Sequence, residues 1–294
     1  SRSETFVTAH ATGLTRHGWD VRVMAGKSGA GIEQSELAEF DAEGVERSYW
    51  GEWSPSSLER ALQFAGDGLH DPGALALLMR NRRWTRPEVF QARRMRRHLS
   101  AAGAGMVHIH YGKFAALLHA AGWAGRAVVT WHGFDANMVP KLRGEDVYQD
   151  LFQTDWVHTV GSSFMADRLV SLGARAERIV KIPMGVDFTR FGEVDRRGRP
   201  EGPLKVISVG RLDEMKGYPV LLEAMAQAKA RGTELRLSIL GEGSERQALE
   251  TRVRELGLDG SVTLLGAQPP GRVARELAAA DVFARVELIV KVKE

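Results

Sequence analysis

The sequence predicts an α/β protein of two domains, each built on a parallel sheet. Short runs rich in β-branched residues alternate with helical patterns, and this alternation favours parallel strands joined by right-handed crossovers. A charged stretch rich in glycine and proline, residues 188–203, interrupts the alternation and cannot hold a core element. We therefore predict an N-terminal domain at residues 1–187, a linker at residues 188–203 and a C-terminal domain at residues 204–294.

Composition limits the classes of protein to which the chain can belong. The 294 residues are 44% hydrophobic and 26% charged, which is typical of a globular protein long enough for two domains. The chain has no cysteine, which excludes disulfides and thiolate metal sites. It has no run of 18 apolar residues and no signal peptide pattern, so we expect a cytoplasmic protein.

The N-terminal domain begins with a helical pattern that ends at Gly18, followed by a β-branched run. The expected elements are a helix at 4–17, strands at 21–25 and 45–49, and a helical insertion at 55–100. We expect this insertion to break near Pro72 and Pro87, because proline ends or kinks a helix.

The helical insertion carries a dense group of arginines between Arg80 and Arg97, with Glu88 as the single acid. The group is Arg80, Arg82, Arg83, Arg86, Arg93, Arg94, Arg96 and Arg97. Apolar residues are interleaved with them, which is typical of a basic amphipathic helix. Two interpretations remain open: a solvated helix face whose apolar side packs inward, and a surface that binds anionic membranes. Nucleic acid is not expected as a partner, because no nucleic-acid-binding motif accompanies the arginines.

Two successive predicted strands end in histidines. The strand at 106–110 ends at His110, and the strand at 127–130 is followed directly by Trp131 and His132. The carboxyl ends of parallel strands lie at one edge of a sheet, so we expect His110 and His132 to lie close together.

The residues after His132 favour a functional turn. Gly133 permits close approach of a ligand, and Asp135 is expected to orient an imidazole. His108, in the middle of its strand, is expected to be structural. A further strand at 156–160, a helix at 164–172 and a strand at 179–182 complete the domain, and Gly185 and Asp187 follow as expected cleft or hinge residues.

The C-terminal domain opens with the apolar run Val206–Val209, which stops at Gly210 before a loop that carries Arg211 and Lys216. Ligands of open α/β sheets bind at the carboxyl ends of strands, and an arginine and a lysine there are typical of a pyrophosphate clamp. On spacing alone, two solvated loop cations are an equally open interpretation.

Later strand ends of this domain carry glycines. Gly241 and Gly243 follow a strand at 235–240, and Gly266 follows a strand at 262–265. A Gly-x-Gly sequence before a helix indicates weakly that backbone amides bind an anion. The other expected elements are a helix from Pro219, helices through 256 and at 273–280, and a strand at 281–284.

The string Val209-Gly210-Arg211-Leu212, followed by Lys216-Gly217, resembles the donor-phosphate loop of the retaining glycosyltransferases of family 4. This resemblance implies the GT-B fold, with two facing Rossmann-like domains. It also implies a nucleotide-diphosphate sugar as donor, UDP- or GDP-linked, whose phosphates Arg211 and Lys216 hold. Gly210, Gly241, Gly243 and Gly266 are then residues of the donor side.

The N-terminal domain resembles the same family. The turn His132-Gly133-Phe134-Asp135 resembles the active-site turn in which the histidine faces the donor sugar, and His110 resembles a neighbouring position that shapes the pocket. Residues 3–6 resemble the segment after the first strand in exopolysaccharide and colanic-acid-type members. The first strand is not found before them.

The sequence departs from the family pattern at its end. Members carry a segment with two glutamates eight positions apart that contacts the donor, and Glu287 and Glu294 lack the surrounding residues of that segment. We therefore expect the family's C-terminal domain to be incomplete in this chain.

The resemblance and the cations together predict retaining transfer of a sugar from a nucleotide donor to a polysaccharide or lipid-linked acceptor. No Asp-x-Asp sequence is apparent, so no metal ligands are assigned and the two cations are expected to replace a metal. No cofactor is expected. Two alternatives remain: a nucleotide-sugar epimerase of the same fold, and a nucleotide-binding scaffold without catalysis. The arginines favour a lipid-linked acceptor at the cytoplasmic face of the membrane.

Overall fold

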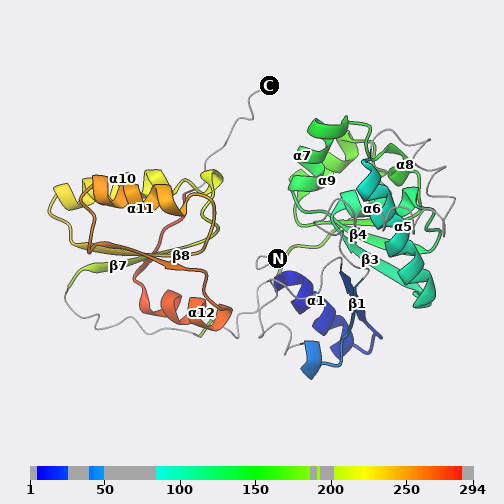
Figure 1. Cartoon of the computed structure of the whole chain (residues 1–294), viewed down its shortest axis with the longest axis horizontal. Helices are drawn as coiled ribbons and strands as arrows, with labels where there is room; N and C mark the ends of the chain where they lie inside the picture. The colour runs from blue at the N-terminus through cyan, green and yellow to red at the C-terminus, as the bar shows by residue number, and fades with distance from the viewer. Residues whose placement is uncertain (1–4, 26–39, 50–83, 186–190, 193–201, 287–294) are drawn as a thin grey trace, which may run out of the picture. The chain divides into compact units, whose positions relative to one another are not determined.

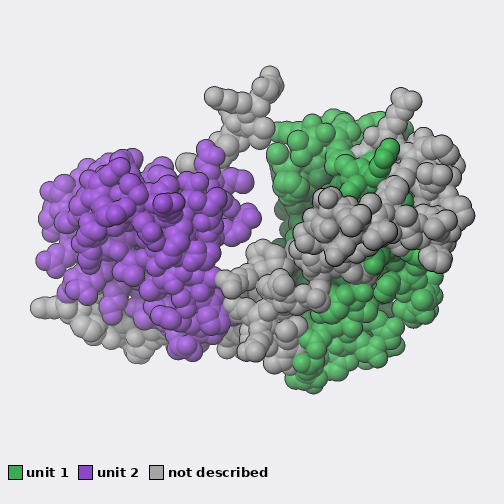
Figure 2. Space-filling model, viewed as in Figure 1, with its two compact units in different colours: residues 1–185 green, residues 186–294 purple. Residues whose placement is uncertain are grey.

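A computed structural model describes residues 5–25, 40–49, 84–185, 191–192 and 202–286. The chain divides into two units, residues 1–185 and 186–294, which Figure 2 colours separately. Most of the predicted linker lies outside the described residues, as do Asp187 and the arginines Arg80, Arg82 and Arg83.

The first unit begins with α1 (Thr5–Arg16), β1 (Arg22–Ala25) and β2 (Glu46–Tyr49). β1 and β2 pair in parallel, with Arg22 opposite Glu46. Ala11 of α1 packs with Phe40 and Val45 in a small buried cluster, which holds the helix against this pair of strands.

The larger sheet of the first unit has four parallel strands in the order β3-β4-β5-β6. Their bounds are β3 (Met106–His110), β4 (Arg126–Thr130), β5 (Val157–Val160) and β6 (Ile179–Lys181). The α-helices described between residues 84 and 185 are α5 (Arg86–Ala101), α6 (Gly112–Ala120), α7 (Phe134–Arg143), α8 (Gln149–Phe152) and α9 (Ser163–Ser171).

The two faces of this sheet differ in chemistry, because side chains alternate along each strand. Ile109 and Val129 lie on the face that packs into the main buried core with residues of α5 to α9. On the opposite face, His108 and Thr130 are joined by a hydrogen bond of 2.7 Å, and Thr130 is bonded to Thr159 at 2.6 Å. α1 contacts this polar face through ring contacts with histidines of β3.

α5 carries the arginines from Arg86 to Arg97, and its packing shows which side of the helix faces the core. The helix begins at Arg86 with Pro87 in its first turn, where proline is well tolerated. Its apolar side chains are buried in the core: Val89, Phe90, Ala92, Met95 and Leu99. Glu88 pairs with Lys113 at 2.6 Å and with Arg143 at 3.2 Å. The apolar side of this helix therefore packs inward. Among the helices that the structure describes, none is long and apolar enough to cross a membrane.

The second unit contains a four-stranded parallel sheet in the order β10-β7-β8-β9. Its strands are β7 (Leu204–Val209), β8 (Leu235–Leu240), β9 (Val262–Gly266) and β10 (Val282–Phe283). α10 (Tyr218–Ala230) and α11 (Arg246–Glu255) cover one face, and α12 (Pro270–Ala279) covers the other (Figure 1). This arrangement leaves the carboxyl end of β7 near the middle of the sheet edge.

Candidate functional site

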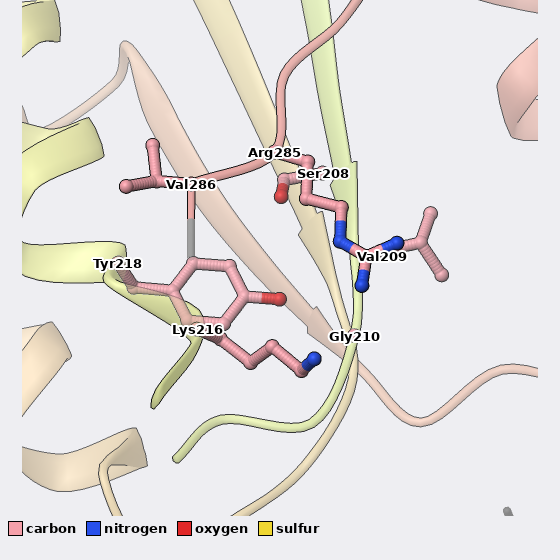
Figure 3. Close-up of a pocket in the computed structure, with 7 residues that line it drawn as sticks. All are labelled: Ser208, Val209, Gly210, Lys216, Tyr218, Arg285 and Val286. Atoms are coloured by element: carbon pink, nitrogen blue, oxygen red, sulfur yellow. The ribbon is translucent and has the colours of Figure 1, made fainter. Parts of the chain in front are cut away.

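A pocket of about 150 Å³ lies at the carboxyl end of β7. It is lined by Ser208, Val209, Gly210, Lys216, Tyr218, Arg285 and Val286. Figure 3 shows the Lys216 ammonium and the Tyr218 hydroxyl directed toward the strand end at Gly210, with the Arg285 guanidinium nearby. The pocket therefore combines two cationic side chains with a phenol hydroxyl.

The sheet order explains how Arg285 reaches this pocket. β10 pairs with β7, with Val282 opposite Val206, and the amide of Ala284 donates a hydrogen bond to the carbonyl of Ile207 at 2.9 Å. The chain therefore leaves β10 beside the end of β7. Sequence reasoning missed Arg285, because only the order of strands in the sheet brings the two segments together.

Lys216 is positioned by a short turn. Residues Glu214–Lys216 form one turn of 3₁₀ helix, which ends at Gly217 in the left-handed conformation, with φ of 59°. The amide of Lys216 donates to the carbonyl of Asp213 at 3.0 Å. α10 begins directly afterwards, with its first turn favoured by Pro219.

Tyr218 limits the size of the residue at position 210. A Cβ atom on Gly210 would lie 3.1 Å from the Tyr218 hydroxyl. Burial raises the pKa of Tyr218, so the hydroxyl keeps its proton and can donate a hydrogen bond. Sequence reasoning missed this residue, although its position two residues after Lys216 is a usable signal.

Arg211 is placed differently from Lys216. Its side chain is 68% exposed and forms an ion pair with Asp213 at 3.1 Å. It is not among the residues that line the described pocket. The structure therefore brings Lys216, but not Arg211, into this pocket, and the predicted two-cation clamp stays a prediction.

Gly241 and Gly243 pack against the loop that carries the cations. A Cβ atom on Gly241 would lie 1.8 Å from the carbonyl oxygen of Gly210, and one on Gly243 would lie 2.2 Å from that of Leu212. The Gly241 amide donates to the carbonyl of Gly266 at 2.9 Å. These glycines thus allow neighbouring strand-end loops to touch, and anion binding by them stays a prediction.

His110 and His132 do meet at the sheet edge of the first unit. Nδ1 of His110 lies 3.2 Å from Nε2 of His132. Phe6 of α1 and Tyr111 contact the His132 ring, with centroid distances of 4.7 Å and 4.6 Å. The pair is therefore held between aromatic rings from α1 and from the end of β3.

Asp135 acts on the backbone of the turn, and its expected orientation of an imidazole stays a prediction. Its carboxylate accepts hydrogen bonds from the amides of Gly112 at 2.6 Å, His132 at 2.9 Å and Ala136 at 3.2 Å. Burial raises the pKa of Asp135 to about 6, against the opposing effect of these amide donors. The residue fixes the backbone from which the His132 side chain projects.

Tyr111 has φ of 76°, the one positive φ of a non-glycine residue in the described backbone. Such a conformation costs on the order of 1–3 kcal/mol, and residues that adopt it cluster at active sites and ligand-binding sites. Its amide donates to the Thr130 carbonyl at 2.9 Å, so neighbouring strands determine the conformation. Sequence reasoning gave Tyr111 no role, because nothing in the residue type indicates its φ.

His108, which we expected to be structural, packs against two other histidines. Its ring stacks on that of His110 at a centroid distance of 4.8 Å and contacts His10 of α1 at 4.5 Å. Burial, together with the neighbouring histidines, lowers the pKa of His108 to about 4 and that of His110 to about 3. The imidazoles are therefore neutral near pH 7.

The remaining predicted residues have simple placements. Gly133 has φ of 22° and precedes α7, and its carbonyl accepts hydrogen bonds from Asn137. Gly185 is exposed at the end of the first unit. Asp187 lies outside the described residues, so its expected hinge or cleft role stays a prediction.

Family models match both parts of the chain. Residues 3–190 match the model described as Glycosyltransferase Family 4, and residues 192–285 match the model described as Glycosyl transferases group 1. The first match spans well over half of the chain.

Individual relatives agree with these models. The glycosyltransferase WcaL of Salmonella typhimurium, named for colanic acid biosynthesis, is 36% identical over 160 residues, or 54% of this chain and 39% of the relative. The amylovoran biosynthesis glycosyltransferase AmsK of Erwinia amylovora is 30% identical over the same shares. The matched part of the chain thus spans about two fifths of the length of these relatives.

Solved structures with the same fold include HepE of Anabaena, crystallised with UDP and glucose, which has a TM-score of 0.66 and 15% identity. That match covers 96% of this chain and 69% of HepE. Sucrose-phosphate synthase of Thermosynechococcus elongatus has a TM-score of 0.66 and 19% identity, over 95% and 68% of the two chains. The predicted α/β fold of the GT-B type is thereby confirmed.

Proposed function

The chain belongs to glycosyltransferase family 4, and from this premise we propose that it transfers a sugar from a nucleotide-diphosphate donor to an acceptor hydroxyl. In the reaction, the bond between the anomeric carbon and the diphosphate oxygen breaks, and the bonding electrons stay on that oxygen. The acceptor oxygen bonds to the same carbon with retention of configuration. The hydroxyl proton leaves with the nucleoside diphosphate.

The observation that carries the proposal is the pocket at the end of β7. Negative charge develops on the departing diphosphate, and fixed cations aimed at that charge lower the barrier. Lys216 and Arg285 supply two cations in the pocket, and Tyr218 supplies a hydroxyl donor. We assign the diphosphate to these side chains, with Arg211 as an additional phosphate ligand. On this assignment, the protein's own cations take the place of a metal ion.

We propose that His132 faces the transferred sugar and that His110 forms part of the wall of the pocket that holds this sugar. The support is the contact between these two rings and the fixed backbone of the turn, which Asp135 holds by its amide bonds. A neutral imidazole nitrogen can accept a hydrogen bond from a sugar hydroxyl or donate one to it.

The acceptor is proposed to be a saccharide or a lipid-linked saccharide of exopolysaccharide assembly at the cytoplasmic face of the membrane. The relatives named for colanic acid and amylovoran biosynthesis support this class of acceptor. The arginines of α5 then contact anionic lipid through charge alone, because the apolar side of that helix is buried. Cosedimentation with anionic liposomes tests this contact, and binding that survives Arg86→Gln with Arg96→Gln contradicts it.

The donor site is tested by calorimetric titration of UDP and GDP into the wild-type chain and three variants. Lys216→Met removes the charge from the pocket and is expected to weaken binding about 10- to 100-fold, since a hydrogen bond to a charged group contributes about 1.5–3 kcal/mol. Lys205→Met, at the opposite end of β7, is the matched control and should bind normally. Arg211→Met reports whether the exposed arginine also contacts phosphate. Normal binding by both Lys216→Met and Arg211→Met would remove the basis for the clamp.

Product analysis distinguishes the proposed reaction from the two alternatives. Transfer with retention gives a new glycoside with the donor's anomeric configuration, as read by NMR. Isomerised nucleotide sugar formed without acceptor would identify an epimerase. Tight nucleotide binding without turnover would identify a scaffold. Activity that survives a strong chelator supports the absence of a catalytic metal.

A further inference from the structure

Three histidines from two elements lie together on the polar face of the first unit's larger sheet. They are His10 of α1 and His108 and His110 of β3, and we refer to them as the histidine cluster. One ring nitrogen of each residue lies within 4.8 Å of one ring nitrogen of each of the others. All three side chains are partly buried, and the cluster combines a helix with a strand.

The local structure brings these side chains together for simple reasons. His108 and His110 are two residues apart on a strand, so their rings lie on the same face and stack. Phe6 and His10 are one turn apart on α1, and they contact the rings of His110 and His108 respectively. The rings of His10 and His108 meet edge to face, with an interplanar angle of 84°.

Neighbouring groups already orient two of the rings. Nε2 of His108 is hydrogen-bonded to Oγ1 of Thr130 at 2.7 Å, and that hydroxyl is bonded to Thr159. Nδ1 of His110 lies 3.2 Å from Nε2 of His132. Each of these two interactions involves one of the two nitrogens of the His108 or His110 ring. Outer partners that fix the ring of a ligating histidine in this way are the rule at metal sites.

We propose that His10, His108 and His110 bind a divalent transition-metal ion, with zinc as the first candidate. Imidazole nitrogen suits zinc, copper and nickel, and three histidines with a water in the fourth position are a known zinc environment. Zinc–nitrogen bonds of about 2.0–2.1 Å place tetrahedral ligand nitrogens roughly 3.4 Å apart. Rotation of the three side chains would shorten the distances between their nitrogens from within 4.8 Å to this value.

The ion proposed here joins α1 to β3. The histidine cluster lies within the first unit, and none of its three residues is among those that line the pocket at the end of β7. The inference rests on these three side chains and is tested without donor or acceptor, although His110 is also assigned above to the wall of the sugar pocket. Its expected effect is to stabilise the first unit, because an ion that binds only the folded state raises the free energy of unfolding.

The test is direct measurement of metal binding by the chain without an oligohistidine tag, which would itself bind zinc. Calorimetric titration with Zn²⁺ is expected to give one ion per chain and a raised Tm. Titration with Co²⁺ is expected to give the visible absorption of a tetrahedral ion. His10→Gln should weaken zinc binding by more than about 10-fold, since loss of an outer partner alone costs that much. His17→Gln, just beyond the end of α1, is the matched control and should bind as the wild type does.

A second variant keeps the test valid if His10→Gln does not fold. His10→Cys replaces the imidazole by a thiolate, another zinc ligand, and should retain binding and shift the Co²⁺ spectrum. The proposal is overturned if the wild-type chain takes up no ion. It is also overturned if His10→Gln, folded by circular dichroism, binds zinc as tightly as His17→Gln.

Discussion

Oδ2 of Asp135 lies 2.6 Å from the amide nitrogen of Gly112 and accepts its hydrogen. The other carboxylate oxygen accepts from the amides of His132 and Ala136. Gly112 follows the end of β3, and His132 follows the end of β4. One buried side chain therefore fixes the two strand ends that carry His110 and His132.

Removing this carboxylate should destabilise the first unit. Asp135→Ala leaves the amides of Gly112 and His132 without acceptors, and a buried unsatisfied donor costs about 1–3 kcal/mol. Asp135→Asn keeps one oxygen acceptor, so its free energy of unfolding should lie between that of the wild type and that of Asp135→Ala. Denaturant unfolding measures the order of the three proteins. Equal stability of wild type and Asp135→Ala would contradict the role given to the carboxylate.

Gly112 should tolerate no side chain. A Cβ atom there would lie 2.1 Å from the ring of Trp131, which is only 3% exposed and cannot move aside. Gly112→Ala should therefore lower the free energy of unfolding by about 3 kcal/mol or more, toward the upper end of the usual cost of overpacking. Gly13→Ala is the control, because a Cβ atom at that helical position meets nothing within 4 Å. It should be neutral or stabilising by up to about 1 kcal/mol.

His158 should make the first unit sensitive to acid. It is 1% exposed, and its Nδ1 accepts a hydrogen bond from the Trp131 indole at 3.2 Å. Burial, with a smaller contribution from the Arg175 guanidinium, lowers its pKa from 6.5 to about 4. As the pH falls, the unfolded chain therefore binds the proton first. The contribution of neutral His158 to the free energy of unfolding is complete above pH 6.5 and is lost as the pH falls towards 4.

The comparison of wild type with His158→Asn isolates this contribution. The asparagine oxygen can accept the indole hydrogen bond but does not titrate. As the pH falls from 6.5 to about 4, the free energy of unfolding of the wild type should decrease by up to about 3 kcal/mol relative to that of the variant. Asp135 opposes this trend in both proteins, because its raised pKa favours the folded state at low pH. A pH-independent difference, measured by urea unfolding, would contradict the neutral buried state of His158.

Gly241→Ala should disrupt the pocket at the end of β7 by displacing Gly210, which lines it. The new Cβ atom would lie 1.8 Å from the carbonyl oxygen of Gly210, and φ of 149° is itself unfavourable for alanine. We expect loss of at least about 1–3 kcal/mol of stability and weaker nucleotide binding. Gly271→Ala in α12 meets only the Arg275 guanidinium, at 4.0 Å, and serves as the control. Calorimetry with UDP and GDP measures the two variants side by side.

Most of the regular elements could be predicted from the sequence, because local patterns encode them. The strands at Met106–His110 and Leu235–Leu240 have the predicted bounds. α7 and α8 were not predicted. Pro140 lies inside α7, where local rules place a helix end, and tertiary packing overrides that preference.

The site could be predicted only where residues adjoin a strand end. His110 and His132 meet as expected, since the carboxyl ends of paired parallel strands share an edge. Arg285 and His10 enter their clusters through tertiary contacts between segments distant in the chain, which residue spacing does not encode. The same limit explains Asp135, whose bonds go to backbone amides that carry no sequence signal.

The exclusive use of parallel strands in the described sheets has a consequence for folding rate. Two parallel strands cannot be joined by a tight hairpin turn, so the segment that connects them is long. The entropy of closing this loop is lost before the strands form any contact, which slows folding. The longest closure joins β10 to β7, where Lys205 and Asp281 bond across 76 residues. We therefore expect β10 to dock late, and with it Arg285. During synthesis on the ribosome, the pocket at the end of β7 is then complete only after Arg285 and Val286 have emerged.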